Sequence, residues 1–393
     1  MNLLPKPKKI TEREGQLLLC HSMYIVMSKE ISDNGIYAAK RLQEAIHQET
    51  GLLLQLSVGE ARDGDLSLGI TETLSEQAYE ITINENGVQI LGGDGAGVLY
   101  GVETFCQILQ QYGGALPCMQ IMDAPDMPNR GYYFDLTRGR ILKLEELKKI
   151  AERMSHYKLN QLQLYVEHTY LFRDFSEMWR DQTPITAEEI RELDSYCRER
   201  HIELVPSLAS FGHLCTLLST KTYGDLCEME DSWKEPFSFW NRMRYHTINV
   251  SDGRSLPLIK KMIAEYMQLF SSDKFNICAD ETFCLGKYKS KELAKECGIH
   301  RLYIDYVKEL AQFLVENGKI PMFWGDIIWN SPELMKELPE TMVCLNWGYA
   351  PEQREDETRA IAQTGAMQYL CPGVCGWNQW ANLIENSYKN ITR

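Results

Sequence analysis

Residues 275–282 have the sequence Phe-Asn-Ile-Cys-Ala-Asp-Glu-Thr, in which an apolar run ends at two adjacent carboxylates, Asp280 and Glu281. A short apolar run closed by polar residues is typical of a buried strand that leads into a loop. In a parallel barrel the carboxyl ends of the strands carry the catalytic residues, whereas an isolated Asp-Glu pair is more often a solvated turn. The surrounding sequence distinguishes these two interpretations.

Short apolar runs alternate with longer amphipathic segments from residue 130 onward. The runs predict strands over 132–136, 161–166, 202–206, 275–280, 320–324, 342–347 and 367–370. Apolar residues at three- and four-residue spacing predict helices over 144–154, 259–266 and 304–314. Repeated strand-helix units imply parallel strands buried on both faces, and about 260 residues is close to the size of a (β/α)8 barrel.

We therefore expect an α/β fold of the (β/α)8 TIM-barrel type, although only seven of its strands are found. A doubly wound sheet of seven strands would fit the same pattern, but the long polar insert over 211–251 favours the loops of a barrel. The sequence ends at Arg393, after a helix predicted around 383–388 and where an eighth strand would begin. We expect a catalytic barrel over 126–393 that lacks its eighth strand, and lowered stability or homo-oligomer formation through the open edge.

Residues 1–125 predict a small α+β domain. Helical spacing over 36–46 and alternation over 81–90 around Asn86-Gly87 predict a helix and a β-hairpin. The glycine-rich stretch 92–97 has neither the spacing of a dinucleotide-binding loop nor the lysine of a phosphate-binding loop, so we interpret it as a turn before a helix. Turn-forming residues over 123–129 connect this domain to the barrel.

Composition excludes several classes of partner and cofactor. The 393 residues carry a formal net charge of −14 and no long basic run, which excludes nucleic acid and anionic membranes as partners. The amino terminus lacks an apolar signal core, and no run of about 18 apolar residues occurs, so we expect a soluble cytoplasmic protein. The twelve cysteines form no C-x-x-C motif, and we expect no disulfide framework, no metal and no cofactor.

The residues that follow successive strands include carboxylates, two histidines and several tryptophans. In chain order they are Arg130 and Arg138 around the first strand, then Glu167, His168, His213, Asp280, Glu281, Trp324, Asp326, Asn346, Trp347 and Trp377. Pyranose rings pack on tryptophan, and glycosidic cleavage needs a carboxylic acid to protonate the leaving oxygen. The set therefore predicts the pocket of an exo-acting glycosidase.

The same residues resemble a known family. Arg130-Gly131 with Asp135 and Arg138, Tyr-Lys-Leu-Asn over 157–160, Phe-Gly-His over 211–213, Asp280-Glu281 and the Trp-Gly elements are similar to glycoside hydrolase family 20, the β-N-acetylhexosaminidases. The resemblance covers nearly the whole chain, including the small first domain. It implies removal of terminal β-linked N-acetylglucosamine or N-acetylgalactosamine by a retaining mechanism in which the substrate's own acetamido oxygen is the nucleophile.

The resemblance also implies roles for single residues. Asp280 would orient the acetamido group, and Glu281 would act as general acid and then as general base. Substrate-binding roles fall on Arg130, Glu167, His213, Trp324, Asp326, Trp347, Tyr369 and Trp377. Among them, Arg130 would hold sugar hydroxyls, the tryptophans would line the pocket, and Tyr369 is the candidate for the acetamido-binding tyrosine. Glu167-His168 stands where many family members have an Asp-rich loop.

Two other interpretations remain. A non-catalytic sugar-binding protein on the same scaffold would explain the missing eighth strand. A barrel hydrolase of another class, such as a metal-dependent one, is disfavoured because the eight histidines form no H-x-H cluster.

Overall fold

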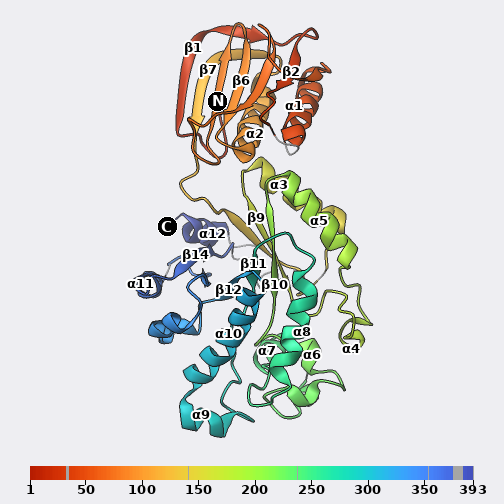
Figure 1. The fold of residues 1–393 in the computed structure, drawn as a ribbon, viewed down its shortest axis with the longest axis vertical. Helices are drawn as coiled ribbons and strands as arrows, with labels where there is room; N and C mark the ends of the chain where they lie inside the picture. The colour runs from red at the N-terminus through yellow and green to blue at the C-terminus, as the bar shows by residue number, and fades with distance from the viewer. Residues whose placement is uncertain (32–34, 140, 237, 353, 375–383, 393) are drawn as a thin grey trace. The chain divides into compact units, whose positions relative to one another are not determined.

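The computed structural model describes residues 1–31, 35–139, 141–236, 238–352, 354–374 and 384–392 (Figure 1). The chain divides into two compact units. The first comprises Met1–Tyr132, Lys143–Leu162 and Glu192–Leu204, and the second comprises Tyr133–Leu142, Gln163–Arg191 and Val205–Arg393. The domain boundary predicted at residue 125 remains a prediction.

The first unit contains a mixed sheet with the strand order β1-β7-β5-β6-β4-β2-β3. Its strands are β1 (Lys9–Leu18), β2 (Tyr24–Met27), β3 (Gln55–Val58), β4 (Leu66–Ile70), β5 (Tyr79–Asn84), β6 (Gly87–Gly92) and β7 (Ala115–Asp123). Helices α1 (Gly35–Thr50) and α2 (Gly95–Tyr112) lie on one face of it (Figure 1). The predicted hairpin is the antiparallel β5-β6 pair.

The glycine-rich stretch 92–97 connects β6 to α2, so the predicted turn before a helix is confirmed. Asp94 caps the helix, because its Oδ1 accepts a hydrogen bond from the amide of Gly97 at 2.7 Å. Gly93 allows a close approach of two chain segments, since a Cβ there would lie 2.0 Å from the carbonyl oxygen of Ser75. The glycines therefore serve backbone packing.

A second, parallel sheet has the strand order β14-β13-β12-β11-β10-β9-β8. Each strand therefore pairs with the strands that precede and follow it in the sequence. Its strands are β8 (Gly131–Asp135), β9 (Gln161–Val166), β10 (Glu203–Leu208), β11 (Lys274–Asn276), β12 (Ile320–Trp324), β13 (Val343–Gly348) and β14 (Met367–Pro372). All six residues of β9 are buried, as a strand covered on both faces requires. The predicted parallel α/β fold with seven strands is confirmed for the described residues.

Helices separate most of these strands. They are α3 (Leu144–His156), α4 (Ser176–Trp179), α5 (Ala187–Glu199), α6 (Cys215–Leu218), α7 (Phe239–Arg244), α8 (Ser255–Met267), α9 (Lys291–Cys297), α10 (Ile299–Glu316), α11 (Glu355–Gln363) and α12 (Ile384–Ile391). Gly318, at φ +72°, follows the end of α10 and allows the chain to turn into β12. Among the described residues no helix combines the length and apolarity needed to cross a membrane.

The strand that was predicted over 275–280 is shorter than expected. β11 ends at Asn276, and Cys278, Ala279 and Glu281 have φ values of +58°, +61° and +50°. Non-glycine residues rarely adopt this left-handed conformation, and it cannot continue a strand. The apolar run is buried as predicted, but its second half is an irregular turn that redirects Asp280 and Glu281.

Neighbouring elements satisfy the backbone of this turn. The carbonyl of Ile277 accepts from Ser210 Oγ at 2.6 Å, and the carbonyl of Ala279 accepts from Tyr303 OH at 3.0 Å. The carbonyl of Cys278 accepts from the amide of Trp324 at 2.9 Å. Because these three carbonyl groups find partners, the surrounding structure can hold a conformation that is locally unfavourable.

Gly212 allows the loop after β10 to pass close to this turn. A Cβ at residue 212 would lie 2.5 Å from the carbonyl oxygen of Asp280 and 3.2 Å from that of Glu281. Both obstacles are backbone atoms, which cannot move aside as a flexible side chain would. His213, the next residue, also has a positive φ, of +58°.

We expect Gly212→Ala to lower the free energy of unfolding by about 1–3 kcal/mol, because the added methyl group must displace backbone. Denaturant unfolding followed by circular dichroism measures the change. Gly253→Ala is the matched control, since a Cβ there meets nothing within 4 Å. Equal stability of the two variants would contradict the close approach.

Candidate active site

His213 lies between the two carboxylates that end the turn. Its Nε2 is 3.3 Å from Asp280 Oδ2 and 3.2 Å from Glu281 Oε2. The His213 side chain is 2% exposed, whereas those of Asp280 and Glu281 are 19% and 25% exposed. The turn and the β10 loop therefore bring three predicted site residues together, with the carboxylates toward solvent and the imidazole behind them.

The charges of these groups depend on one another. Burial lowers the pKa of His213, but Asp280 and the contact with Glu281 more than offset it and raise that pKa to about 10. Burial likewise raises the pKa of Asp280, but the charges of His213 and Arg138 hold it below its usual range. His213 is thus an imidazolium at neutral pH. The stabilisation of the folded state by this charge is complete below about pH 6.5, the ordinary pKa of histidine, and is lost as the pH rises through about 10.

Asp326 contacts the pair from the loop after β12. Its Oδ2 accepts a hydrogen bond from the amide of Glu281 at 3.0 Å. Burial, followed by the charge of Asp280, raises the pKa of Asp326 well above its usual range. A protonated Asp326 can hold the turn without adding a further negative charge to it.

Glu167 is the centre of a second buried group. Its Oε1 lies 3.0 Å from Arg138 Nη2 and accepts from Tyr165 OH at 2.9 Å, and its Oε2 accepts from Arg242 Nη2 at 3.0 Å. Burial raises the pKa of Glu167, but the charges of Arg138 and Arg242 more than offset it, so the net shift is downward. The charges of His213 and His168 shift the pKa of Glu167 in the same direction.

Aromatic side chains occur at the carboxyl ends of the strands. Trp324, the last residue of β12, is 8% exposed and packs edge-on against Tyr133 at a centroid distance of 4.9 Å. Trp347 in β13 lies 5.3 Å from the ring of Tyr349. Burial, then the charges of Asp280 and Glu281, raises the pKa of Tyr349. Tyr369 lies within β14, in register with Leu345 of β13.

Two predicted residues do not join this arrangement. Arg130 precedes β8, at the amino end of the strand, and its guanidinium donates to the carbonyls of Lys158 and Met127 at 2.9 and 2.7 Å and to Tyr100 OH at 3.2 Å. Parallel strands present their sites at the carboxyl ends, which is where Arg138 lies and Arg130 does not. Trp377 lies outside the described residues.

Sequence reasoning left three residues without a role. Arg138 was noted beside the first strand, but the spacing did not show which arginine stands at the functional end. Arg242 comes from α7, inside the long insert, and a lone arginine in a polar loop carries no signal in the sequence. Tyr349 follows Trp347 by two residues, and its aromatic character at a strand end was the available signal.

His213, Asp280 and Glu281 also have the geometry of a cation site, because each offers a ligand atom and these atoms lie within 4.8 Å of one another. A positively charged His213 disfavours this use, since metal ligation requires a neutral imidazole. The donor set therefore fits a cluster of ion pairs better than a metal centre.

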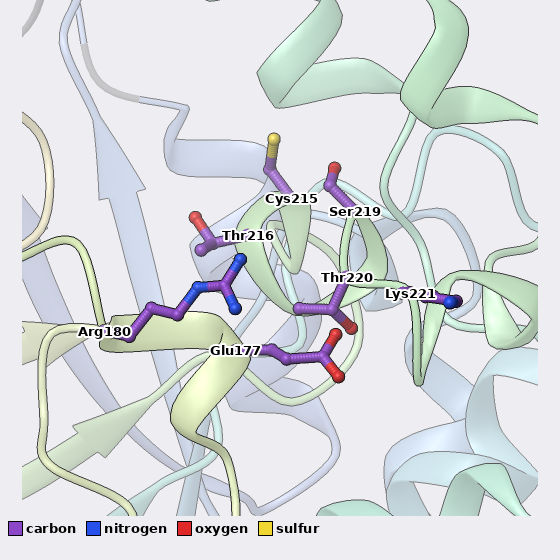
Figure 2. A pocket seen from close by; sticks show the side chains of 7 residues that line it. All are labelled: Glu177, Arg180, Cys215, Thr216, Ser219, Thr220 and Lys221. Carbon is purple, nitrogen blue, oxygen red and sulfur yellow. The ribbon is translucent and has the colours of Figure 1, made fainter.

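A cavity of about 500 Å³ lies between α4 and α6. Glu177, Arg180, Cys215, Thr216, Ser219, Thr220 and Lys221 line it (Figure 2). Glu177 is already bound, because its carboxylate accepts from the amide and the hydroxyl of Thr222 at 3.2 and 2.5 Å. None of the predicted site residues lines this cavity.

Family models match both parts of the chain. Residues 1–124 match "Glycosyl hydrolase family 20, domain 2", and residues 128–375 match "Glycosyl hydrolase family 20, catalytic domain". The second match alone spans more than half of the 393 residues.

Characterised relatives agree with these matches at low identity. A β-hexosaminidase from Porphyromonas gingivalis is 23% identical over 365 residues, which are 84% of this chain and 46% of that protein. The chain thus spans about half the length of this relative.

Solved structures share the fold. The exo-β-N-acetylglucosaminidase from Vibrio harveyi in complex with N-acetylglucosamine has a TM-score of 0.77 at 20% identity, with 94% of this chain and 60% of that chain covered. The β-N-acetylhexosaminidase from Bacteroides fragilis has a TM-score of 0.75 at 18% identity, with 93% and 74% covered. With family models over 1–124 and 128–375, the chain belongs to glycosyl hydrolase family 20.

Proposed function

We propose that this chain is an exo-acting β-N-acetylhexosaminidase that removes terminal β-linked N-acetylglucosamine or N-acetylgalactosamine with retention of configuration. The observation that carries the proposal is the contact of one buried imidazolium with both adjacent carboxylates, at 3.3 and 3.2 Å. This contact holds Asp280 and Glu281 on one side of the turn, where both can reach one sugar ring. The N-acetylglucosamine bound to the Vibrio harveyi structure supports the choice of sugar.

In the first step the carbonyl oxygen of the substrate's acetamido group attacks the anomeric carbon. The bond from that carbon to the leaving oxygen breaks, and Glu281 gives its proton to this oxygen. Asp280 accepts a hydrogen bond from the acetamido N–H and stabilises the positive charge that develops on the oxazolinium ring. An ionised Asp280 suits this role, because the neighbouring cations lower its pKa.

In the second step a water molecule attacks the anomeric carbon. Glu281 now accepts a proton from this water, and the bond to the acetamido oxygen breaks, which restores the acetamido group. His213 touches both carboxylates and acts as a positioning residue throughout. No metal or cofactor takes part in either step.

We assign the binding of the sugar hydroxyls to Arg138 rather than to Arg130. Arg138 stands at the carboxyl end of β8 and is fixed by Asp135 at 3.2 Å and Glu167 at 3.0 Å. Glu167 supports Arg138 through this ion pair. Trp324 and Trp347 line the sugar, Asp326 holds the turn, and Tyr369 and Trp377 remain candidates for the acetamido pocket.

Hydrolysis of aryl N-acetyl-β-glucosaminides by Glu281→Gln tests the general acid. We expect kcat/KM for a β-linked disaccharide to fall by roughly 100-fold or more, because its leaving oxygen needs the proton, while a dinitrophenyl glycoside loses far less. Glu292→Gln, on the exposed surface of α9 with a side chain 77% exposed, is the control. Equal losses for both substrates would contradict the role of Glu281. A wild-type protein that binds the sugar without turnover would instead be a sugar-binding protein.

The pH dependence of His213→Gln tests the charge cluster. Without the imidazolium, the Asp280 carboxylate is protonated more easily, so its pKa rises and activity is lost at a higher pH on the acid side. We expect the acid limb of kcat/KM to move up by about 1–2 pH units. His300→Gln, outside the site, should leave the profile in place, and an unchanged profile in His213→Gln would contradict the coupling.

A comparison of Arg138→Gln with Arg130→Gln tests the assignment of the sugar-binding arginine. We expect the first to lower kcat/KM by roughly 100-fold, because a charge-assisted contact to substrate is lost. The second should mainly lower the melting temperature, because its hydrogen bonds go to Lys158, Met127 and Tyr100. The opposite ranking of activities would restore the assignment to Arg130.

A further inference from the structure

A second cavity, of about 300 Å³, directly adjoins the segment that carries Glu281. Arg244, Tyr245, Phe283, Cys284, Lys287 and Tyr288 line it. None of these residues has a part in the mechanism above. The cavity combines aromatic rings with two cationic side chains.

Two segments of the chain place this cavity next to the site. Phe283 follows Glu281 by two residues, and its amide donates to the carbonyl of Glu281 at 2.7 Å. On the other wall, Arg244 follows Arg242 by two residues, and Arg242 binds Glu167 in the site. Cys284 Sγ donates to the carbonyl of Arg244 at 3.0 Å and ties the two walls together.

The side chains at this cavity are available to a ligand. Phe283 and Tyr288 are 41% and 43% exposed and line the same cavity. The Arg244 guanidinium lies 5.2 Å from the ring centre of Trp240, which is 62% exposed. Within the described part of the chain, no carboxylate lies within ion-pair distance of Arg244 or Lys287.

We infer that this cavity is the subsite for the sugar on the leaving side of the scissile bond, and that it selects a sugar bearing a carboxylate or a sulfate. The inference rests on the proposed function, because Glu281 gives its proton to the leaving oxygen and the leaving sugar must therefore lie beside Glu281. Phe283 and Tyr288 offer faces for a pyranose ring. Arg244 and Lys287 offer the donors that an anionic substituent needs.

The overall negative charge of the chain would favour a neutral leaving sugar over an acidic one. The chain carries a net charge of −14, and the site itself presents Asp280 and Glu281, so an anionic substrate is repelled unless cations meet it locally. A preference for an acidic leaving sugar would therefore come from Arg244 and Lys287, and not from the net charge of the chain.

The experiment compares β-linked disaccharides that share N-acetylglucosamine and linkage but differ in the leaving sugar. The leaving sugar is glucose, glucuronic acid or sulfated glucose, and an aryl N-acetyl-β-glucosaminide reports the basal reaction. We expect kcat/KM to be roughly 10-fold higher for at least one acidic disaccharide than for the glucose one at low salt. The preference should shrink strongly at about 0.5 M NaCl, because salt screens partly exposed charges. The two acidic arms distinguish a carboxylate site from a sulfate site.

Arg244→Gln and Lys287→Gln should each reduce the ratio of acidic to neutral kcat/KM by roughly threefold, and their combination should abolish the preference. Lys291→Gln is the matched control, because it removes an exposed cation of the same segment that does not line the cavity. Tyr288→Ala should raise KM for every disaccharide through the lost ring face. Thermal unfolding of each variant confirms that it is folded.

The outcomes separate the two proposals. No turnover of the aryl glycoside would overturn the proposed function. Turnover of the aryl glycoside with an acidic disaccharide hydrolysed no faster than the neutral one would overturn the subsite alone. A preference that survives the double substitution would also overturn it.

Discussion

A single buried cation connects the fold of this chain to its chemistry. His213 has almost no access to water, so its charge persists only because Asp280 and Glu281 lie within 3.3 Å of it. Conversely, two adjacent carboxylates at the end of a buried segment would repel each other without this cation. Removing one member of such a buried charge cluster typically costs about 3–5 kcal/mol, because the remaining charges lose their compensation. The three side chains therefore form one unit.

The backbone makes this unit possible. Residues on a regular strand face opposite sides, so Asp280 and Glu281 could not both meet one imidazole if β11 continued to residue 281. The strand ends at Asn276 instead, and residues in the left-handed backbone conformation turn the chain. Hydrogen bonds from Ser210, Tyr303 and Trp324 compensate for the strain, and Gly212 gives the turn the space that it occupies. The elements around the parallel sheet thus hold an irregular segment in a fixed conformation.

The insert between β10 and α8 contributes further charged side chains to this region. Its helix α7 contributes Arg242 to Glu167 and, two residues later, Arg244 to the neighbouring cavity. Glu167 is held by arginines from two distant parts of the chain, so the insert and the first strand of the parallel sheet are joined through one carboxylate. Under the proposed function, a loop that is anchored in this way would determine which leaving sugar is bound without changing Asp280 or Glu281.

Apolar periodicity and the polarity of parallel strands are local signals, so the sequence alone predicts the alternation of strands and helices and the mixed first domain. It also predicts that His213, Asp280 and Glu281 follow strand ends. Strand ends were predicted closely for β9 and β12, whose apolar runs end where their hydrogen bonding ends. Three features required the tertiary structure: β11 stops early, Arg138 rather than Arg130 stands at the carboxyl end of β8, and Arg242 reaches Glu167. These features depend on left-handed backbone held by distant donors and on contacts between residues about 75 and 30 positions apart, which no local pattern encodes.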